Sequence, residues 1–438
     1  MQNALVPKEE QPYKIPNNWC WVRLESINKY KSETLNPKNA MEKMFELYSV
    51  PSFDNKYPEI LIGKDIGSNK YIVKKNDILL CKINPRINRV WQVYQHTNFG
   101  QICSSEWIVI RNEILNKSFL RYYFTSEYFR NRLCENVSGV GGSLTRAKPK
   151  LVQLYEVPLS PINEQQRIVN IIESLFAKLD RAKELIENTL AQFEQNKMAI
   201  LHKAFIGELT AKWRKENNID LSSWQEKTID ELCTSLKYGT SKKSNPEGSV
   251  VVLRMGNLQN GEIDWSNLMY TDDKDDIEKY LLKKGDVLFN RTNSPELVGK
   301  TSIYRGEYPA IYAGYLIKLD YGKDIIGEYL NYMMNSTKAK HYCYTVKTDG
   351  VSQSNINAKK IGAFEIPVPT IEEQQEIVNI LDKLLAKYNK IKNLEQQLEK
   401  IELLKKAILA KAFRGELGTN NPDEESAENL LKEILAEK

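Results

Sequence analysis

The chain contains the same helical phrase twice. The segment "EQQRIVNII" occupies residues 164–172, and it returns as "EQQEIVNIL" at residues 373–381, 209 positions later. Over residues 164–180, ten of seventeen positions are identical in the two copies, whereas unrelated sequences of average composition match at about one position. A chain of this kind has to form two similar structures in tandem.

The repeat extends well beyond this phrase. "KKNDILL" (74–80) aligns with "KKGDVLF" (283–289), and "EVP" (156–158) aligns with "EIP" (365–367), both at the same offset. Downstream, "AILHKAFIGEL" (199–209) aligns with "AILAKAFRGEL" (407–417) after the loss of one residue. The sequence therefore predicts a duplication of about 205 residues, with too few copies for a solenoid.

Each copy begins with short runs of β-branched and aromatic residues, which predict strands. These runs are residues 71–80, 89–94 and 106–110 in the first copy, and 249–255, 286–290 and 310–319 in the second. Helices are expected near 118–134 and 327–343. The predicted fold class is α+β, with two mixed α/β domains in tandem.

A long helix is expected after each domain. Apolar residues then recur at steps of three and four, the spacing of a coiled-coil seam, and Asn163 and Thr370 stand where a helix cap is expected. The cheapest partner for each apolar stripe is the other helix of the same chain, which predicts an antiparallel coiled coil with pseudo-two-fold symmetry. The predicted residues of helix pairing and subunit binding are Ile168, Ile172, Leu175, Leu179, Ile377, Leu381, Leu384 and Tyr388.

These elements predict four segments. The first lobe covers residues 1–160, a central helix 161–212, the second lobe 213–368, and a C-terminal helix and tail 369–438. A length of 438 residues agrees with two or more separate cores.

Composition excludes several classes of protein. The three histidines and six scattered cysteines, with no CxxC pair, argue against structural zinc and for reduced thiols. No apolar run approaches the eighteen or so residues that cross a bilayer, and no signal sequence is present, so we expect a soluble, cytoplasmic protein. A net charge of +5 permits nucleic-acid binding without arguing for it.

The sequence offers little catalytic chemistry. An adenine methyltransferase needs a glycine-rich cofactor loop and an N/D-P-P-Y/F segment, and neither is present. "VGKTS" (298–302) resembles the end of a phosphate loop, but Ser294 stands where its first glycine belongs. The acidic residues Asp272, Asp273, Asp275 and Asp276 are interpreted as a solvated surface. No catalytic residue, metal or cofactor is predicted.

Clusters of base-reading side chains follow equivalent strands of the two copies. Arginine, lysine, asparagine and glutamine match the hydrogen-bonding edges of bases; "CKINPRINR" (81–89) and "FNRTNS" (289–294) supply them at aligned positions with different content. Two lobes that recognise different half-sites would show this pattern, and so would two surface loops that diverged after duplication. The weaker candidates 143–150, 237–245 and 351–357 are otherwise ordinary solvent-exposed turns.

The predicted DNA contacts of the first lobe are Lys82, Asn84, Arg86, Asn88, Arg89, Ser143, Thr145, Arg146 and Lys148. Those of the second lobe are Lys237, Tyr238, Thr240, Lys242, Lys243, Asn290, Arg291, Thr292, Asn293, Ser352, Gln353 and Asn355.

With these residues identified, the whole chain resembles the specificity subunit of Type I restriction-modification enzymes. The resemblance rests on the tryptophan-containing openings "IPNNWCWVRL" and "SSWQEKTI", on "KKGDVLFNRTNSPELVGKTSIY", on the junction "IPVPTIEEQQEIV", and on "AFIGELTAKWRKEN" and "AFRGEL". It implies that each lobe is a target recognition domain that reads one half of a bipartite site in double-stranded DNA. It also implies that the helices bind two methyltransferase subunits, with a single specificity chain per complex, and that restriction subunits then join.

Two other functions stay open at this point. One is an enzyme with concealed chemistry, for example a fused nuclease or methyltransferase, which a cofactor-binding assay would detect. The other is a coiled-coil scaffold that binds only protein, which salt-dependent retention of DNA would exclude.

Overall fold

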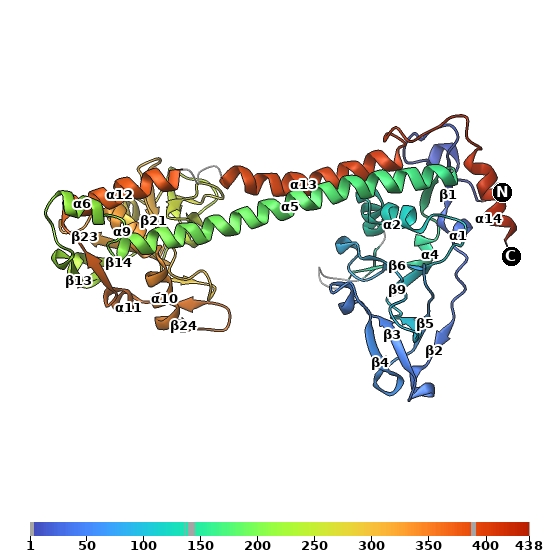
Figure 1. Cartoon of the computed structure of the whole chain (residues 1–438), viewed down its shortest axis with the longest axis horizontal. Helices are drawn as coiled ribbons and strands as arrows, with labels where there is room; N and C mark the ends of the chain where they lie inside the picture. The colour runs from blue at the N-terminus through green and yellow to red at the C-terminus, as the bar shows by residue number, and fades with distance from the viewer. Residues whose placement is uncertain (1–3, 136, 139–144, 387–390, 438) are drawn as a thin grey trace. The chain divides into compact units, whose positions relative to one another are not determined.

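A computed structural model of the chain describes residues 4–135, 137–138, 145–386 and 391–437, without the side chains of 391 and 392. The described chain forms two compact units (Figure 1). Unit 1 combines residues 1–186 with 395–438, and unit 2 contains residues 187–394. The long helix α5 (Ile162–Phe205) contributes its first part to unit 1 and its last part to unit 2.

Within its described residues, unit 1 contains two sheets of three or more strands. The three-stranded sheet has the order β7-β6-β9, and the five-stranded sheet has the order β2-β5-β8-β3-β4 with β3 and β8 parallel. Its strands are β1 Cys20–Arg23, β2 Thr34–Leu35, β3 Met44–Tyr48, β4 Glu59–Ile62, β5 Lys70–Ile72, β6 Ile78–Cys81, β7 Val90–Gln92, β8 Gly100–Cys103, β9 Trp107–Ile110, β10 Val137–Ser138, β11 Arg146–Ala147 and β12 Glu156–Leu159. Its helices are α1 Leu24–Ile27, α2 Lys117–Thr125, α3 Glu127–Glu135, α4 Pro149–Val152, most of α13 Ile391–Phe413, and α14 Ala427–Ala436.

Unit 2 repeats part of this topology, with one sheet extended and the other formed by the three strands β18-β15-β22. The sheet β21-β19-β23 corresponds to β7-β6-β9 and is extended by β14, and β15 pairs in parallel with β22 as β3 does with β8. Its strands are β13 Gln225–Thr228, β14 Cys233–Tyr238, β15 Val250–Leu253, β16 Leu258–Gln259, β17 Glu262–Ile263, β18 Tyr270–Thr271, β19 Val287–Asn290, β20 Thr292–Asn293, β21 Thr301–Ile303, β22 Ala310–Tyr312, β23 Leu316–Tyr321, β24 Thr348–Asp349, β25 Ser354–Asn355 and β26 Glu365–Val368. Its helices are α6 Ala211–Glu216, α7 Ile229–Leu232, α8 Lys274–Tyr280, α9 Gly327–Met334, α10 Thr337–Val346, α11 Ala358–Gly362 and α12 Ile371–Ala386.

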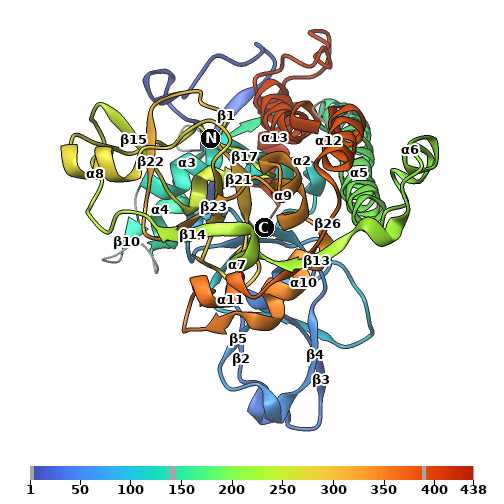
Figure 2. The same cartoon turned by 90° about the vertical axis from the view of Figure 1, so that its left-hand side faces the viewer.

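In both units the first and last strands of the lobe close on each other. β1 pairs antiparallel with β12 in unit 1, and β13 pairs antiparallel with β26 in unit 2, where Figure 2 shows the two strands side by side. The prediction of two tandem α/β domains in an α+β fold is confirmed.

The "KK-x-D" phrase forms a turn and not the middle of a strand. The Lys74 backbone N–H donates to Asp77 Oδ2 at 2.9 Å, and the Lys283 N–H donates to Asp286 Oδ2 at 2.8 Å. The residue before each aspartate has positive φ, which asparagine and glycine tolerate best. The run 71–80, predicted as one strand, is therefore two strands, β5 and β6.

Each predicted lobe helix is also divided in two. Ser126 separates α2 from α3, and its hydroxyl accepts from the backbone of Phe129 at 3.3 Å. Ser336 does the same before α10, accepting from Ala339 at 3.3 Å. A serine hydroxyl that caps a new helix start competes with continuation of the previous helix.

The long helices pack antiparallel within each unit. In unit 1, Lys183 of α5 bonds to Glu402 of α13 at 3.2 Å, and Asp180 pairs with Lys405. In unit 2, the last part of α5 shares a buried core with α12. The expected cap at Thr370 is confirmed, since its hydroxyl accepts from the Glu373 N–H at 3.3 Å, but that at Asn163 is wrong because α5 already begins at Ile162.

The repeated phrase places a fully buried glutamate at the start of each long helix. In unit 1, Glu164 accepts hydrogen bonds from Trp19 Nε1 at 2.7 Å, Thr419 Oγ1 at 3.1 Å and Asn420 Nδ2 at 3.0 Å. These donors come from the opening of the lobe and from the C-terminal tail. One carboxylate therefore fastens the helix to both.

Unit 2 has the equivalent arrangement around Glu373. Trp224 Nε1 donates at 2.9 Å, Thr210 Oγ1 at 2.6 Å and Arg214 Nη1 at 2.5 Å. A buried carboxylate needs such donors because its desolvation is otherwise costly. The glutamate and tryptophan of the repeat are thus structural, a role that the sequence alone did not reveal.

The glutamine that follows each glutamate bonds to backbone of its own lobe. Gln165 Nε2 donates to Ser160 O at 2.9 Å and its Oε1 accepts from the Asn116 N–H at 3.0 Å. Gln374 makes the same two kinds of bond, to Pro369 O at 2.9 Å and from the Ile326 N–H at 2.8 Å. The "EQQ" phrase therefore sets how each long helix sits on its own lobe.

Candidate nucleic-acid interface

In the first lobe, two of the predicted segments meet after β6. The Asn84 N–H donates to Thr145 O at 2.8 Å, and the Ala147 N–H donates to Lys82 O at 2.8 Å. Asn84 and Asn88 flank a short 3-10 turn, Pro85–Ile87, and both have left-handed backbone conformations. The structure thus brings residues 82–89 and 145–147 together, while Ser143 lies outside the described residues.

Glu106, the residue directly before β9, joins these segments. Its Oε1 lies 3.3 Å from Arg146 Nη2, and its Oε2 lies 4.0 Å from Lys82 Nζ. Glu106 was not among the predicted contacts, because a single acidic residue before a buried strand carries no base-reading pattern.

Buried polar atoms without a hydrogen-bond partner gather at this surface. Within the described part of the chain, Asn84 Oδ1, Asn88 Oδ1, Arg89 Nε and Glu106 Oε2 make no such bond. Buried polar groups are usually satisfied, so a group of four unpaired polar atoms in one place is unusual and marks this surface. Arg86 and Lys148 are exposed beside them.

In the second lobe, Arg291 is the centre of the corresponding surface. Its guanidinium donates to Asn355 Oδ1 and to Gly314 O, both at 3.3 Å, and lies 4.9 Å from the centre of the Tyr238 ring. Asn355 in turn donates to Thr292 Oγ1 at 2.8 Å. Four of the predicted contacts, from three separate segments, are therefore neighbours.

The turn 350–353 between β24 and β25 extends from this surface. Ser352 and Gln353 are exposed at its tip, and β25 pairs with β20 through Asn293 and Ser354. The turn thus joins two strands of the three-stranded sheet β20-β25-β24, which also contains Thr292.

Four other predicted contacts of the second lobe, namely Asn290, Thr240, Lys242 and Lys237, are bonded within the protein. Asn290 and Thr240 are buried, and Thr240 donates to Asp276. Lys242 pairs with Asp273 at 2.7 Å and Lys237 with Asp320 at 3.0 Å, while Lys243 is exposed. In this structure, Asn290 and Thr240 present no free side chain to a ligand.

The acidic run near 272–276 has structural roles. Asp273 caps α8 by accepting from the Asp276 N–H at 2.9 Å, and Asp272 accepts from the Ser249 N–H at 2.9 Å. The Ser249 hydrogen bonds hold the pKa of Asp272 below its ordinary value. Among the residues described by the structure, no group of three or more His, Cys, Asp or Glu is arranged to hold a metal ion.

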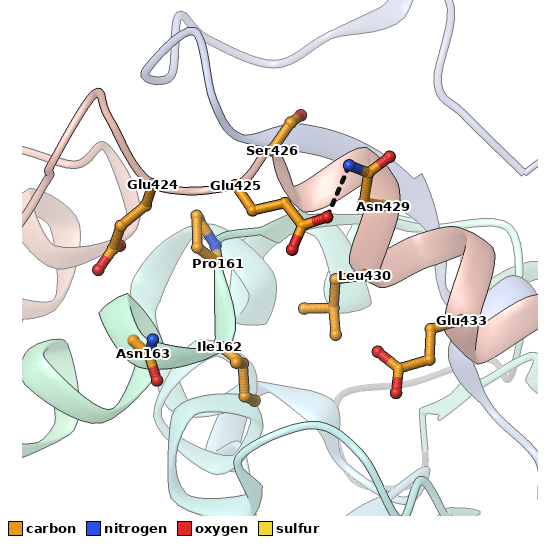
Figure 3. A pocket seen from close by; sticks show the side chains of 9 residues that line it. All are labelled: Pro161, Ile162, Asn163, Glu424, Glu425, Ser426, Asn429, Leu430 and Glu433. Atoms are coloured by element: carbon orange, nitrogen blue, oxygen red, sulfur yellow. Dashed lines mark hydrogen bonds between the residues drawn. The ribbon is translucent and has the colours of Figure 1, made fainter.

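A cavity of about 180 Å³ lies in unit 1 where α14 covers the start of α5 (Figure 3). Glu424, Glu425 and Glu433 line it together with Ile162 and Leu430. Glu424 is bound by Arg167 at 2.7 Å, and Glu425 by Asn429 at 2.9 Å. The lining therefore belongs to the contact between tail and helix.

The predicted helix-pairing residues divide by burial. Ile168 and Ile172 lie in the core of unit 1, and Ile377 and Leu381 lie in that of unit 2, all fully buried. Leu175, Leu179 and Leu384 are half-buried, and Tyr388 lies outside the described residues. The buried four are enclosed by their own unit.

None of the helices, over the residues described, is long and apolar enough to span a membrane.

A family model described as the Type I restriction modification DNA specificity domain matches the chain twice, at residues 16–192 and 222–403. The chain belongs to the Type I restriction-modification DNA specificity family. The first match contains β1 to β12 and α5 as far as residue 192, and the second contains β13 to β26, α12 and part of α13. The family unit therefore corresponds to the repeat unit seen in the sequence.

Named specificity subunits are similar over most of their length. The EcoKI specificity subunit of Escherichia coli K12 is 29% identical over 399 residues, which cover 86% of this chain and 84% of the relative. The StySPI specificity subunit of Salmonella potsdam is 27% identical over 358 residues, covering 78% and 75%.

Solved structures share the fold. A chain from a study of complex assembly and conformational transition of the type I R-M system aligns with a TM-score of 0.72 at 22% identity, covering 93% of this chain and all of the other. The HsdS subunit from Thermoanaerobacter tengcongensis aligns with a TM-score of 0.51, also at 22% identity.

Proposed function

We propose that this chain is the DNA-recognition subunit of a Type I restriction-modification complex. Each lobe recognises one half of an asymmetric bipartite site in double-stranded DNA, and the chain itself catalyses nothing. Its partners are two methyltransferase subunits, with one specificity chain per complex, and restriction subunits in the complete assembly. It acts in the cytoplasm.

One observation carries this proposal. Within a family of DNA specificity domains, the two lobes have corresponding strands but different polar side chains where β6 and β19 end. A protein that recognises two unequal half-sites needs one scaffold and two sets of base contacts. A coiled-coil scaffold that binds only protein needs neither.

The division of labour follows the repeat. Residues 1–160 and 213–368 recognise the two half-sites, whereas 161–212 and 369–438 hold the lobes and bind the methyltransferase subunits. Since Ile168, Ile172, Ile377 and Leu381 are buried within their units, they act in this scheme through helix packing, and partner contact falls to exposed positions of the same helices.

The experiment is expression of the chain with a methyltransferase subunit of its family, followed by sequencing of methylated adenines in the host DNA. The proposal expects one split, asymmetric motif, and no methylation when either protein is absent. Methylation or cleavage by the chain alone would support the enzyme alternative. A complex that forms but methylates no preferred sequence would support the scaffold alternative.

A further inference from the structure

Three backbone positions of the candidate surface correspond between the two lobes, and backbone hydrogen bonds establish the first two, 82 and 106 in the first lobe. In the first lobe, the Lys82 N–H donates to Glu106 O at 3.0 Å, and the Ala147 N–H donates to Lys82 O at 2.8 Å. In the second lobe, the Arg291 N–H donates to Tyr315 O at 3.0 Å, and the Ile356 N–H donates to Arg291 O at 2.8 Å. Each residue of the second set stands 209 positions after its counterpart.

The third corresponding position, residue 146 in the first lobe, is established by strand pairing. Arg146 forms an isolated bridge with Ile83, and Asn355 pairs with Thr292, again 209 positions later in both strands. Positions 82, 106 and 146 therefore correspond to 291, 315 and 355. We call Lys82, Glu106 and Arg146 the first trio, and Arg291, Tyr315 and Asn355 the second trio.

The backbone of the trios is the same, but their side chains have only the cation at positions 82 and 291 in common. The first trio contains two cations with a carboxylate between them, and its side chains range from 20% to 51% exposed. The second contains one cation, an amide and a phenol, and Tyr315 is 49% exposed. Two lobes that recognise different bases through one scaffold would differ at such positions.

Glu106 is the distinctive member of the first trio. Its carboxylate is an acceptor placed between the donors of Arg146 and Lys82, and its Oε2 accepts no hydrogen bond within the described chain. In the major groove, guanine presents the acceptors O6 and N7, and cytosine presents its N4 amino group as a donor. A row of donors and an acceptor complements a G·C pair.

We propose that Glu106 is a specificity-determining residue, whose carboxylate accepts a hydrogen bond from the amino group of a cytosine in the first half-site. Lys82 or Arg146 donates to the paired guanine. This inference rests on the proposed function, and it assigns to position 106 a role that its lone acidic side chain does not suggest. Tyr315 occupies the corresponding position for the second half-site.

The test uses the complete chain in complex with its methyltransferase subunits. After the motif is mapped, duplexes that carry it with one base pair changed at a time are bound to the wild-type complex and to Glu106→Gln. This variant keeps the size of the side chain and replaces the carboxylate by an amide. We expect discrimination at one G·C pair of the first half-site to fall by about ten- to a hundred-fold, with the second half-site unchanged.

Two variants serve as controls. Glu113→Gln removes another carboxylate of the first lobe, which pairs with Lys74 at 2.6 Å, and it should leave the motif unchanged. Tyr315→Phe should alter preference only in the second half-site. Both are read with the same set of duplexes.

Unchanged discrimination in Glu106→Gln would overturn the inference. Equal weakening on every duplex would also overturn it, because that result indicates a structural or general electrostatic role. A wild-type complex with no bipartite motif would instead remove the proposed function on which the inference rests, so the two failures are distinguishable.

Discussion

Each unit contains an equivalent buried glutamate, but the two glutamates accept hydrogen bonds from different parts of the chain. Glu373 in unit 2 is held by Thr210 and Arg214, from the segment that leads directly into the second lobe. Glu164 in unit 1 is held by Thr419 and Asn420, more than 250 residues away in sequence. The C-terminal tail thus performs for the first lobe what the segment between the repeats performs for the second.

The donors to the two glutamates also differ in charge. Arg214 provides a buried cation beside Glu373, whereas the hydrogen bonds to Glu164 come from the neutral side chains of Trp19, Thr419 and Asn420. The repeat therefore keeps the acceptor and changes its donors. The following variants act on one unit at a time, and each can be followed by hydrogen exchange of peptides from unit 1 and from unit 2.

The largest effect is expected from removal of residues 419–438. Unit 1 loses the two tail donors to Glu164 and the buried side chains of Leu431 and Ile434, each of which contributes about 2–5 kcal/mol in a typical core. We expect exchange protection of unit 1 to collapse while that of unit 2 is kept. Removal of residues 437–438 alone is the control, and equal losses in both units would contradict the comparison.

Arg214→Met should have the next largest effect, and it should be confined to unit 2. It leaves the fully buried Glu373 without its cation, which typically costs about 3–5 kcal/mol. The matched change in unit 1, Asn420→Ala, removes a neutral donor and should cost about 1–3 kcal/mol. If the two variants destabilise their units equally, the difference in charge has no energetic meaning.

Glycines that follow α5 and α13 allow a further comparison of the stability of the two units. Gly207 and Gly415, in the repeated "F-x-G-E-L", have φ of +80° and +74°, and a Cβ on them would collide with Leu221 and Pro16 respectively. Left-handed backbone costs an ordinary residue about 1–2 kcal/mol. We expect Gly415→Ala to be the more costly in thermal unfolding, because a proline ring yields less than the end of a leucine.

The control is Gly418→Ala, where φ is +72° and the space is open. The loss of stability in Gly418→Ala measures the cost of the left-handed backbone without a steric contact. A Gly418→Ala variant as unstable as Gly415→Ala would show that the contact with Pro16 adds nothing.

The smallest effect concerns pH. Hydrogen bonds from Arg167 lower the pKa of Glu424 below its ordinary value of 4.5, so this pair stabilises the tail above that pH. The contribution is lost as the pH falls through the lowered pKa. For a partly exposed pair it should amount to at most about 1 kcal/mol.

The difference in Tm between wild type and Glu424→Gln should therefore be present at pH 7 and shrink towards pH 3. The exposed Glu416→Gln serves as control, with no such trend. A constant difference across this range would exclude the ion pair as its cause.

Much of the fold could be predicted because the repeat is visible in the sequence. The offset of 209 suffices to locate β6 and β19, β12 and β26, and the starts of the long helices from the residues alone. The predicted boundaries were wrong where a single side chain ends a helix or strand. An aspartate forms the turn at residues 74–77 between two strands, and a serine divides each lobe helix in two. Alternation and periodicity do not show such single hydrogen bonds.

The candidate interface was only partly predictable. Polar clusters after β6 and β19 were visible as runs of Asn, Arg and Lys, but burial of Asn290 and Thr240 depends on tertiary packing. Glu106 and Tyr315 were missed because they reach the site from a neighbouring strand, through contacts that no local sequence pattern records.

The most direct test of recognition by separate lobes is an exchange of one lobe. Residues 13–158 are replaced by the corresponding lobe of another specificity subunit, and the methylated motif of the resulting complex is sequenced beside that of the wild type. We expect one half of the motif to change to the donor's half-site while the other half stays the same. A motif in which both halves change, or neither does, would contradict the claim that each copy of the repeat recognises its own half of the site.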